Sequence, residues 1–256
     1  MSGANVAEGR GLTALVLAGS RAAGDPLARA YAVPHKAALP LAGRPMGVWV
    51  VEALRACPAI GRVVVAGDGL DLPGAEVLPA GATIGATVEA ALDALGTPLL
   101  VPTIDHPLLT PALIDEFLRR VPAEADCAVA VARADTVLRA YPQARRTWLR
   151  FRRARVTGCN LFLLAGPPAR DVVRYWTRMD AHRKDPAAMV RAVGPGTLAL
   201  WSLGLLSVGG AARRLSRRLG AQLAVVEMTS AEAAIDVDKP ADVELAQAIL
   251  ARRATY

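Results

Sequence analysis

Short apolar runs bounded by turn residues alternate with helical patterns along the first half of the chain. Four of these runs predict strands, at 12–17, 62–66, 98–102 and 127–132. Three helical patterns lie between them, at 46–56, 85–95 and 111–120. This alternation predicts βαβ units and a parallel sheet. Because the runs are apolar at consecutive positions, helices should cover both faces of that sheet.

The rhythm changes after residue 133, where an arginine-rich segment begins. From there on we expect a strand at 159–164, helices at 169–180 and 186–193, and an uncharged stretch at 192–212. A last strand at 223–227 and a last helix at 241–253 follow. No linker rich in Gly, Ser or Pro divides the chain, and no internal repeat is visible. We therefore expect a single domain over 1–256 with a basic subregion at 141–220.

The uncharged stretch at 192–212 is marginal in length for a membrane span, which needs about 20 predominantly apolar residues. Pro195 and several glycines also interrupt it. We expect a buried or interfacial helix there instead.

Composition supports a folded chain. With 256 residues, of which 53% are hydrophobic, and a mean hydropathy of +0.31, the chain can bury a large core and is too apolar to be disordered. Its three cysteines form no CxxC pair, so neither a zinc site nor a disulfide framework is indicated. The first residues lack the apolar run of a signal peptide, and a reducing cytoplasm fits best.

The net charge of +7 is concentrated in one part of the chain. Residues 141–220 hold 16 basic and three acidic side chains, a net charge of +13, whereas the segments before and after them each carry −3. A basic block between two mildly acidic segments favours a local anionic partner. A phosphorylated substrate, a membrane surface and nucleic acid all fit this charge.

Two early segments contain residue types that bind phosphate. The first predicted strand leads into a turn of small residues, 17–26, at the sheet edge where open α/β folds bind ligands. Small residues let backbone N–H groups approach a phosphate, and an ordinary strand-to-helix turn explains the pattern about as well. Lys36 is the only lysine in the first 183 residues of an arginine-rich chain, and its ammonium would act as a compact charge on phosphate.

Carboxylates follow two later segments. Asp105 comes directly after an apolar strand, a placement that suits a metal ligand and a turn cap equally well. Asp236 and Asp238 alternate before the last helix, so on an extended chain they share a face and could supply a second metal ligand. Mg²⁺ is commonly bound by one or two carboxylates together with substrate phosphates.

Together these segments resemble the nucleotidyltransferases with a molybdenum-cofactor-guanylyltransferase-like NTP-transferase domain, over nearly the whole chain. The matching segments, in the family's order, are 17–19, 36–46, 105–107 and 235–243. Residues 157–162 are similar to the family's acceptor strand, and residues 79–83 with Thr87 are similar to its base-reading loop. The resemblance implies a three-layer, Rossmann-like fold of GT-A type, with a mostly parallel central sheet and helices on both faces.

The resemblance also implies roles for individual residues. The implied catalytic residues are Lys36, Asp105 and Arg21, and Mg²⁺ would be held by Asp105 with Asp236 or Asp238. The NTP would be bound by Leu17, Ala18, Gly19, Ser20, Gly81, Ala82, Thr83 and Thr87, and the acceptor by Asn160, Arg183 and Lys184. Ser20 stands where the family has a second glycine. The family's arginine falls on Gly24, so Arg21 or Arg29 would take its place.

The implied activity is Mg²⁺-dependent transfer of NMP from an NTP, with CTP or GTP favoured, to a small phosphorylated acceptor. The acceptor would be a sugar, polyol or alcohol phosphate, and pyrophosphate would be released. A guanylyltransferase acting on a molybdopterin-type cofactor has the same motif order and stays open, as does a non-catalytic basic binding module. Few aromatic residues accompany the basic block, so we expect no specific nucleic acid partner.

Residues 197–218 suggest a further contact. Trp201 and nearby leucines are followed by four arginines, which gives an apolar face with a cationic end. Such a segment could lie on an anionic membrane, which would place the protein at the membrane's inner face, or it could line a homodimer interface. A packed helix with solvated arginines explains the pattern at least as well.

Overall fold

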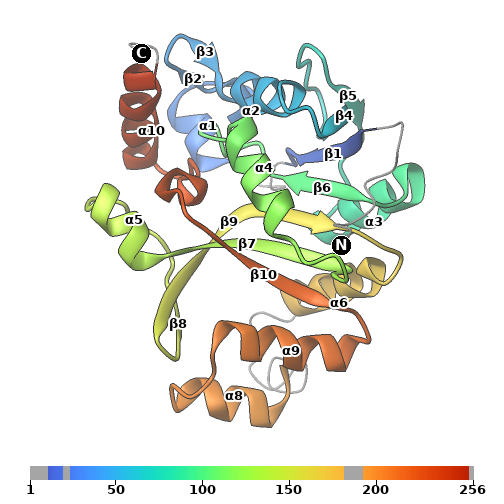
Figure 1. Cartoon of the computed structure of the whole chain (residues 1–256). Helices are drawn as coiled ribbons and strands as arrows, with labels where there is room; N and C mark the ends of the chain where they lie inside the picture. Colours follow the sequence, from blue (N-terminus) through green and yellow to red (C-terminus); the bar gives the residue numbers. More distant parts are fainter. Residues whose placement is uncertain (1–10, 20–23, 182–192, 254–256) are drawn as a thin grey trace.

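The computed structural model describes residues 11–19, 24–181 and 193–253, and its centre is a sheet between two layers of helices (Figure 1). The strands of this sheet are β1 (Leu12–Leu17), β4 (Ile60–Ala66), β5 (Glu76–Leu78), β6 (Leu99–Pro102), β7 (Cys127–Arg133), β8 (Leu149–Phe151), β9 (Ala154–Leu164) and β10 (Leu223–Met228). Their order is β10-β7-β9-β6-β1-β4-β5, with β8 paired to β9. The strands β2 (Pro40–Leu41) and β3 (Arg44–Pro45) form a separate hairpin.

The sheet is mostly parallel, as predicted, and β9 is the strand that makes it mixed. β9 runs antiparallel to β6 and to β7, whereas the pairs β1·β4, β1·β6, β4·β5 and β7·β10 are parallel. The chain leaves the carboxyl end of β7, passes through α5 (Ala134–Ala140) and enters β9 through a hairpin with β8. Because the chain does not return to the end of the sheet where β7 begins, β9 must run antiparallel to β7.

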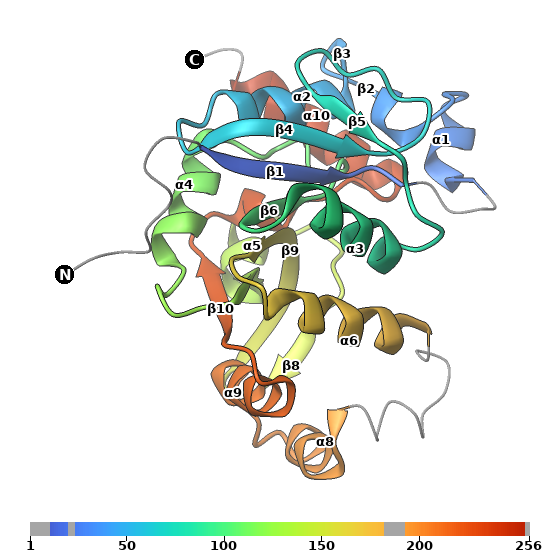
Figure 2. The same ribbon diagram turned by 90° about the vertical axis from the view of Figure 1, so that its right-hand side faces the viewer.

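Helices cover both faces of the sheet, and β1 shows why. Ala14 and Val16 pack into the core under α2 (Met46–Arg55), α4 (Pro111–Arg120) and α10 (Pro240–Arg253). Leu15 and Leu17 pack on the opposite side, against α3 (Ile84–Leu95) and α6 (Ala169–Ala181). Figure 2 shows these two layers on either side of the strands. The consecutive apolar residues of each strand therefore serve two cores.

The remaining helical elements are shorter or lie in the second half of the chain. They are α1 (Pro26–Ala30), η1 (Lys36–Ala38), α8 (Pro195–Ser202), α9 (Val208–Leu219) and η2 (Ala231–Ala234). The predicted helix at 186–193 lies almost entirely outside the described residues. Among the helices that the structure describes, none is both long and apolar enough to span a bilayer.

We expected a buried or interfacial helix over 192–212, and the described residues of this stretch do not form a buried helix. The stretch forms α8 and the first turn of α9, and no residue of α8 is buried. Gly204, with a φ of +68°, lies in the turn between the two helices, and Ser207 begins α9 by accepting a hydrogen bond from the N–H of Gly210 at 3.1 Å. These turn and cap residues interrupt the apolar run, so most of its large side chains stay near the surface, whereas Leu206 is buried.

Phe117 tests the packing of the helical layer that contains α4. Its side chain is fully buried, and Phe117→Ala should lower the free energy of unfolding by about 3–5 kcal/mol, measured by urea denaturation. Leu118→Ala is the matched control, because Leu118 is the next residue of α4 and is only partly buried. Equal losses for the two variants would contradict this packing.

Candidate active site

Lys36 joins three distant parts of the chain. It begins η1, whereas Asp105 follows β6 and Asp238 precedes α10. The Lys36 Nζ donates to Asp105 Oδ2 at 2.9 Å and to Asp238 Oδ1 at 2.6 Å. The structure therefore brings together three of the residues that the sequence predicted to act in one site.

The two carboxylates keep the Lys36 side chain charged. Only 9% of this side chain is exposed, and burial by itself lowers the pKa of a lysine. Asp105 and Asp238 outweigh that effect and hold the pKa of Lys36 above its ordinary value. The site thus contains a permanent cation between two carboxylates.

Asp105 also connects the strands at the carboxyl edge of the sheet. Its backbone carbonyl accepts from the N–H of Val237 at 2.8 Å, which ties the end of β6 to the C-terminal segment. Its carboxylate accepts a hydrogen bond from the Thr103 hydroxyl. The neighbouring N–H of Ile104 donates to the carbonyl of Leu17 at 3.0 Å, so β1 is held in the same arrangement.

Asp236 has a different set of partners from Asp238. Arg146 donates to its carboxylate, and also to its carbonyl oxygen at 2.9 Å and to the Asp242 carboxylate at 3.0 Å. Asn160 of β9 donates through Nδ2 to Asp236 Oδ2 at 2.8 Å. The predicted acceptor residue and the predicted metal ligand are therefore in direct contact.

Burial is the largest cause that raises the pKa of Asp236, Arg146 opposes it, and the nearby carboxylates of Asp105 and Asp238 add to it, so that the pKa is about 6. Three carboxylates are thus close enough to influence one another. A cation bound beside them would stabilise the ionised form of Asp236.

The predicted phosphate loop is only partly free to bind phosphate. The N–H of Ala18 donates to the carbonyl of Ala66 at 2.9 Å, because the ladder between β1 and β4 continues one residue past the end of β1. This N–H is therefore engaged in the sheet. Gly19 is exposed directly after it. Ser20 and Arg21 lie outside the described residues.

His35 fixes the other side of this loop. Its Nδ1 accepts from the N–H of Ala37 at 2.9 Å, so its Nε2 carries the proton and donates to the carbonyl of Ala18 at 2.7 Å. The residue directly before Lys36 therefore attaches η1 to the end of β1.

Thr87 organises the predicted base-reading loop. Its hydroxyl accepts from the N–H of Gly81 at 2.9 Å and donates to the carbonyl of Thr83 at 3.0 Å. A Cβ at Gly81 would lie 2.8 Å from the Thr87 nitrogen, so a side chain does not fit there. The Thr83 hydroxyl caps α3 by accepting from the N–H of Ala86 at 3.1 Å. Both threonine hydroxyls thus shape the loop, in which Ala82 lies between Gly81 and Thr83.

The donor set suits a magnesium ion that binds together with a nucleotide. Among the described residues, no group of three or more His, Cys, Asp or Glu side chains is placed to hold a metal ion alone. Asp105 and Asp238 nevertheless bind one cation, the Lys36 ammonium, between them. Mg²⁺ in proteins often takes one or two carboxylates and completes its coordination with phosphates. These carboxylates fit that requirement.

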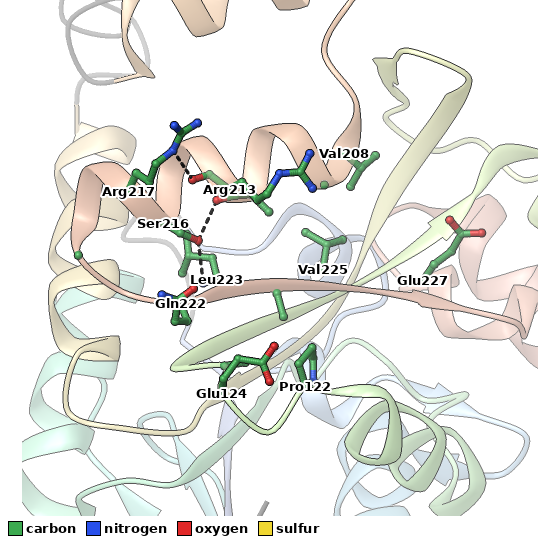
Figure 3. A pocket seen from close by; sticks show the side chains of 15 residues that line it. Pro122, Glu124, Val208, Arg213, Ser216, Arg217, Gln222, Leu223, Val225 and Glu227 are labelled. Carbon is green, nitrogen blue, oxygen red and sulfur yellow. Dashed lines mark hydrogen bonds between the residues drawn. The ribbon is translucent and has the colours of Figure 1, made fainter. Parts of the chain in front are cut away.

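The basic subregion contributes less to this site than its charge suggested. Among the arginines of this subregion that the structure describes, Arg146 pairs with Asp236 and with Asp242. Its guanidinium therefore binds carboxylates of the protein. Arg183 and Lys184 lie outside the described residues. A hollow of about 990 Å³ between α9 and β10 is lined by Arg213, Arg217 and Glu227, but by no predicted site residue (Figure 3).

Three residues of the site were missed in the sequence. They are His35, Thr103 and Arg146. His35 and Thr103 lie next to predicted motifs, and this proximity is the signal that could have found them. Arg146 gives no such signal, because it is one of many arginines in its segment.

The site lies at the carboxyl edge of an α/β sheet, with a small-residue loop after the first strand and a lysine between carboxylates. These features are typical of a nucleotide-binding enzyme. The comparisons identify the protein as a nucleotidyltransferase. The model of the MobA-like NTP transferase domain matches residues 14–221, most of the chain, so the protein belongs to this family. A comparison with curated proteins gave no match.

Solved structures support the same assignment. A hypothetical transferase from Thermus thermophilus is 32% identical, with a TM-score of 0.81, over 91% of this chain and 99% of that one. Two more distant structures share the fold. The 2-C-methyl-D-erythritol 4-phosphate cytidylyltransferase of Thermus thermophilus is 21% identical, with a TM-score of 0.53, over 94% of this chain and 98% of its own. A CMP:2-keto-3-deoxy-manno-octonic acid synthetase in complex with CTP is 15% identical, with a TM-score of 0.58, over 95% and 99%.

Thr87→Val tests the hydroxyl that shapes the loop at 81–83. The substitution keeps the size of the side chain but leaves the N–H of Gly81 without its acceptor, so the amide hydrogen of Gly81 should exchange faster with solvent. Hydrogen exchange with mass spectrometry measures this change. Thr13→Val on β1, which lies away from the loop, is the control and should leave exchange at 81–83 unchanged. Unchanged exchange in Thr87→Val would contradict the assigned contact.

Proposed function

We propose that this nucleotidyltransferase transfers NMP from CTP or GTP to a small phosphorylated acceptor, such as a sugar, polyol or alcohol phosphate, in a Mg²⁺-dependent reaction that releases pyrophosphate. The observation that carries the proposal is the Lys36 ammonium held between Asp105 and Asp238 at the carboxyl edge of the sheet. It provides both charges that the reaction needs, a cation for phosphate oxygens and carboxylates for a metal ion.

Each group has a defined task in this proposal. The Lys36 ammonium would contact the phosphates and the departing pyrophosphate. Asp105 and Asp238, with Asp236 beside them, would hold Mg²⁺, which would polarise the α-phosphoryl group and neutralise the developing charge. An acceptor phosphate is already ionised near neutral pH, so its oxygen can attack the α-phosphorus without a general base.

Asn160 supports placing the acceptor near Asp236. It adopts a left-handed backbone conformation with a φ of +49°, at an irregular position in the pairing of β7 with β9. This conformation is rare outside glycine and is more common for asparagine than for most other residues. The side chain is only partly buried and reaches Asp236, so an acceptor bound beside Asn160 would lie next to the metal carboxylates.

The choice of CTP or GTP rests on the family. Two similar structures bear the names of a cytidylyltransferase and of a CMP-sugar-acid synthetase bound to CTP, which makes CTP the first nucleotide to test. A cytoplasmic location and a homodimer remain predictions from the sequence.

A pyrophosphate-release assay tests the proposed function. Each of the four NTPs would be offered with Mg²⁺ and a panel of phosphorylated sugars, polyols and alcohols. We expect release of pyrophosphate with CTP or GTP and with one class of acceptor, and loss of the signal when EDTA removes the metal. Turnover that persists in EDTA, or transfer only to acceptors without a phosphate, would contradict the proposal.

Asp105→Asn tests the central carboxylate. The substitution keeps the shape of the side chain but removes its charge, so kcat should fall roughly 100-fold or more because charge stabilisation in the transition state is lost. Asp115→Asn on the exposed side of α4 is the control and should behave like the unmodified protein. Unchanged turnover of a folded Asp105→Asn protein would remove Asp105 from the mechanism.

A further inference from the structure

The hairpin of β8 and β9 meets the turn that follows α8. The N–H of Arg152, between the two strands, donates to the carbonyl of Leu206 at 2.7 Å. Residues 149–155 and 201–206, which are far apart in the sequence, therefore form one continuous surface, which we call the hairpin surface. Figure 1 shows it at the end of the molecule opposite α10.

The hairpin surface exposes large apolar side chains. Leu149 is 49% exposed, Trp201 43%, Leu203 71% and Leu205 55%. These are four of the eight large hydrophobic residues that are exposed in the described part of the chain. Because the other four belong to separate elements, the concentration here marks an interaction site rather than scattered surface residues.

The same surface carries four exposed arginines, Arg150, Arg152, Arg153 and Arg155. Arg150 and Arg155 are directly opposite each other in the antiparallel pair β8·β9, where like charges destabilise the pairing. Within the described residues, no carboxylate forms an ion pair with any of the four. Asp135 lies nearby but is bound by Arg133 at 3.2 Å. An external anion would relieve this repulsion.

These observations restrict the kind of partner. Residues 141–155 and 194–220 contain no acidic residue, so a second copy of the chain placed symmetrically on this surface would bring arginines against arginines. A polynucleotide would not use the exposed leucines. An anionic lipid surface satisfies both features, because its headgroups bind the arginines while its interface accepts tryptophan and leucine.

We propose that the hairpin surface docks the protein on an anionic membrane, with Trp201, Leu203 and Leu205 entering the interface and the hairpin arginines binding headgroups. This assignment shifts the basic part of the contact away from α9. Arg213 and Arg217 of α9 line the hollow beside β10, which lies outside the hairpin surface (Figure 3). Membrane docking requires neither a nucleotide nor a functional active site.

Vesicle flotation of the full chain tests this proposal, without nucleotide or Mg²⁺. Vesicles of phosphatidylglycerol mixed with phosphatidylcholine should carry the protein, vesicles of pure phosphatidylcholine should not, and added salt should weaken the binding. Arg150→Glu combined with Arg153→Glu, and separately Leu203→Ser combined with Leu205→Ser, should each reduce partitioning by about tenfold or more.

Two matched variants control for general changes of charge and hydrophobicity. Arg252→Glu reverses an exposed charge on α10, and Val77→Ser removes an apolar side chain that is 47% exposed on β5; both should bind vesicles like the unmodified protein. Absence of binding to anionic vesicles, or equal binding by all variants, would overturn the proposal. Sedimentation that shows a dimer abolished by the hairpin variants would overturn it in favour of a second copy.

Discussion

The arrangement of the site depends on one buried cation. A lysine ammonium with little exposure is costly unless carboxylates pair with it, and Lys36 has two such partners. Those partners lie 69 and 202 residues further along the chain. The fold must therefore bring the start of η1, the end of β6 and the segment before α10 to the same edge of the sheet. A parallel arrangement of β1 and β6 achieves this, since their carboxyl ends meet there.

A second set of contacts extends this pairing toward β9. Arg146 binds Asp236 and Asp242, and Asn160 donates to the remaining oxygen of Asp236. Lys36 and Arg146 thus share the neutralisation of neighbouring carboxylates. The antiparallel direction of β9 matters here, because it places Asn160 beside the end of β6, where Pro102 pairs with Leu161. The irregular strand is therefore also the strand that connects the acceptor side to the metal carboxylates.

The sequence predicted the layered sheet because the central strands serve two cores, and their consecutive apolar residues record that requirement. It predicted Lys36 and Asp105 because a rare lysine and a carboxylate after a strand are local signals. Arg146 could not be predicted, since its role depends on a contact with Asp236 about ninety residues away and nothing local distinguishes it from neighbouring arginines. The division of the stretch at 192–212 was missed for a related reason. Its apolar content predicted one buried or interfacial helix, but Gly204 and the Ser207 cap divide it into two helices.

We propose that the nucleotide binds where Lys36 meets Asp105 and Asp238. A crystal structure with Mg²⁺ and an analogue of CTP or GTP, in which a methylene group replaces the oxygen between the α- and β-phosphorus atoms, would show whether it does. We expect phosphate oxygens on the Lys36 ammonium, a magnesium ion on Asp105 with Asp236 or Asp238, and the base beside residues 81–83. A nucleotide bound elsewhere, for example in the hollow between α9 and β10, would contradict the proposal.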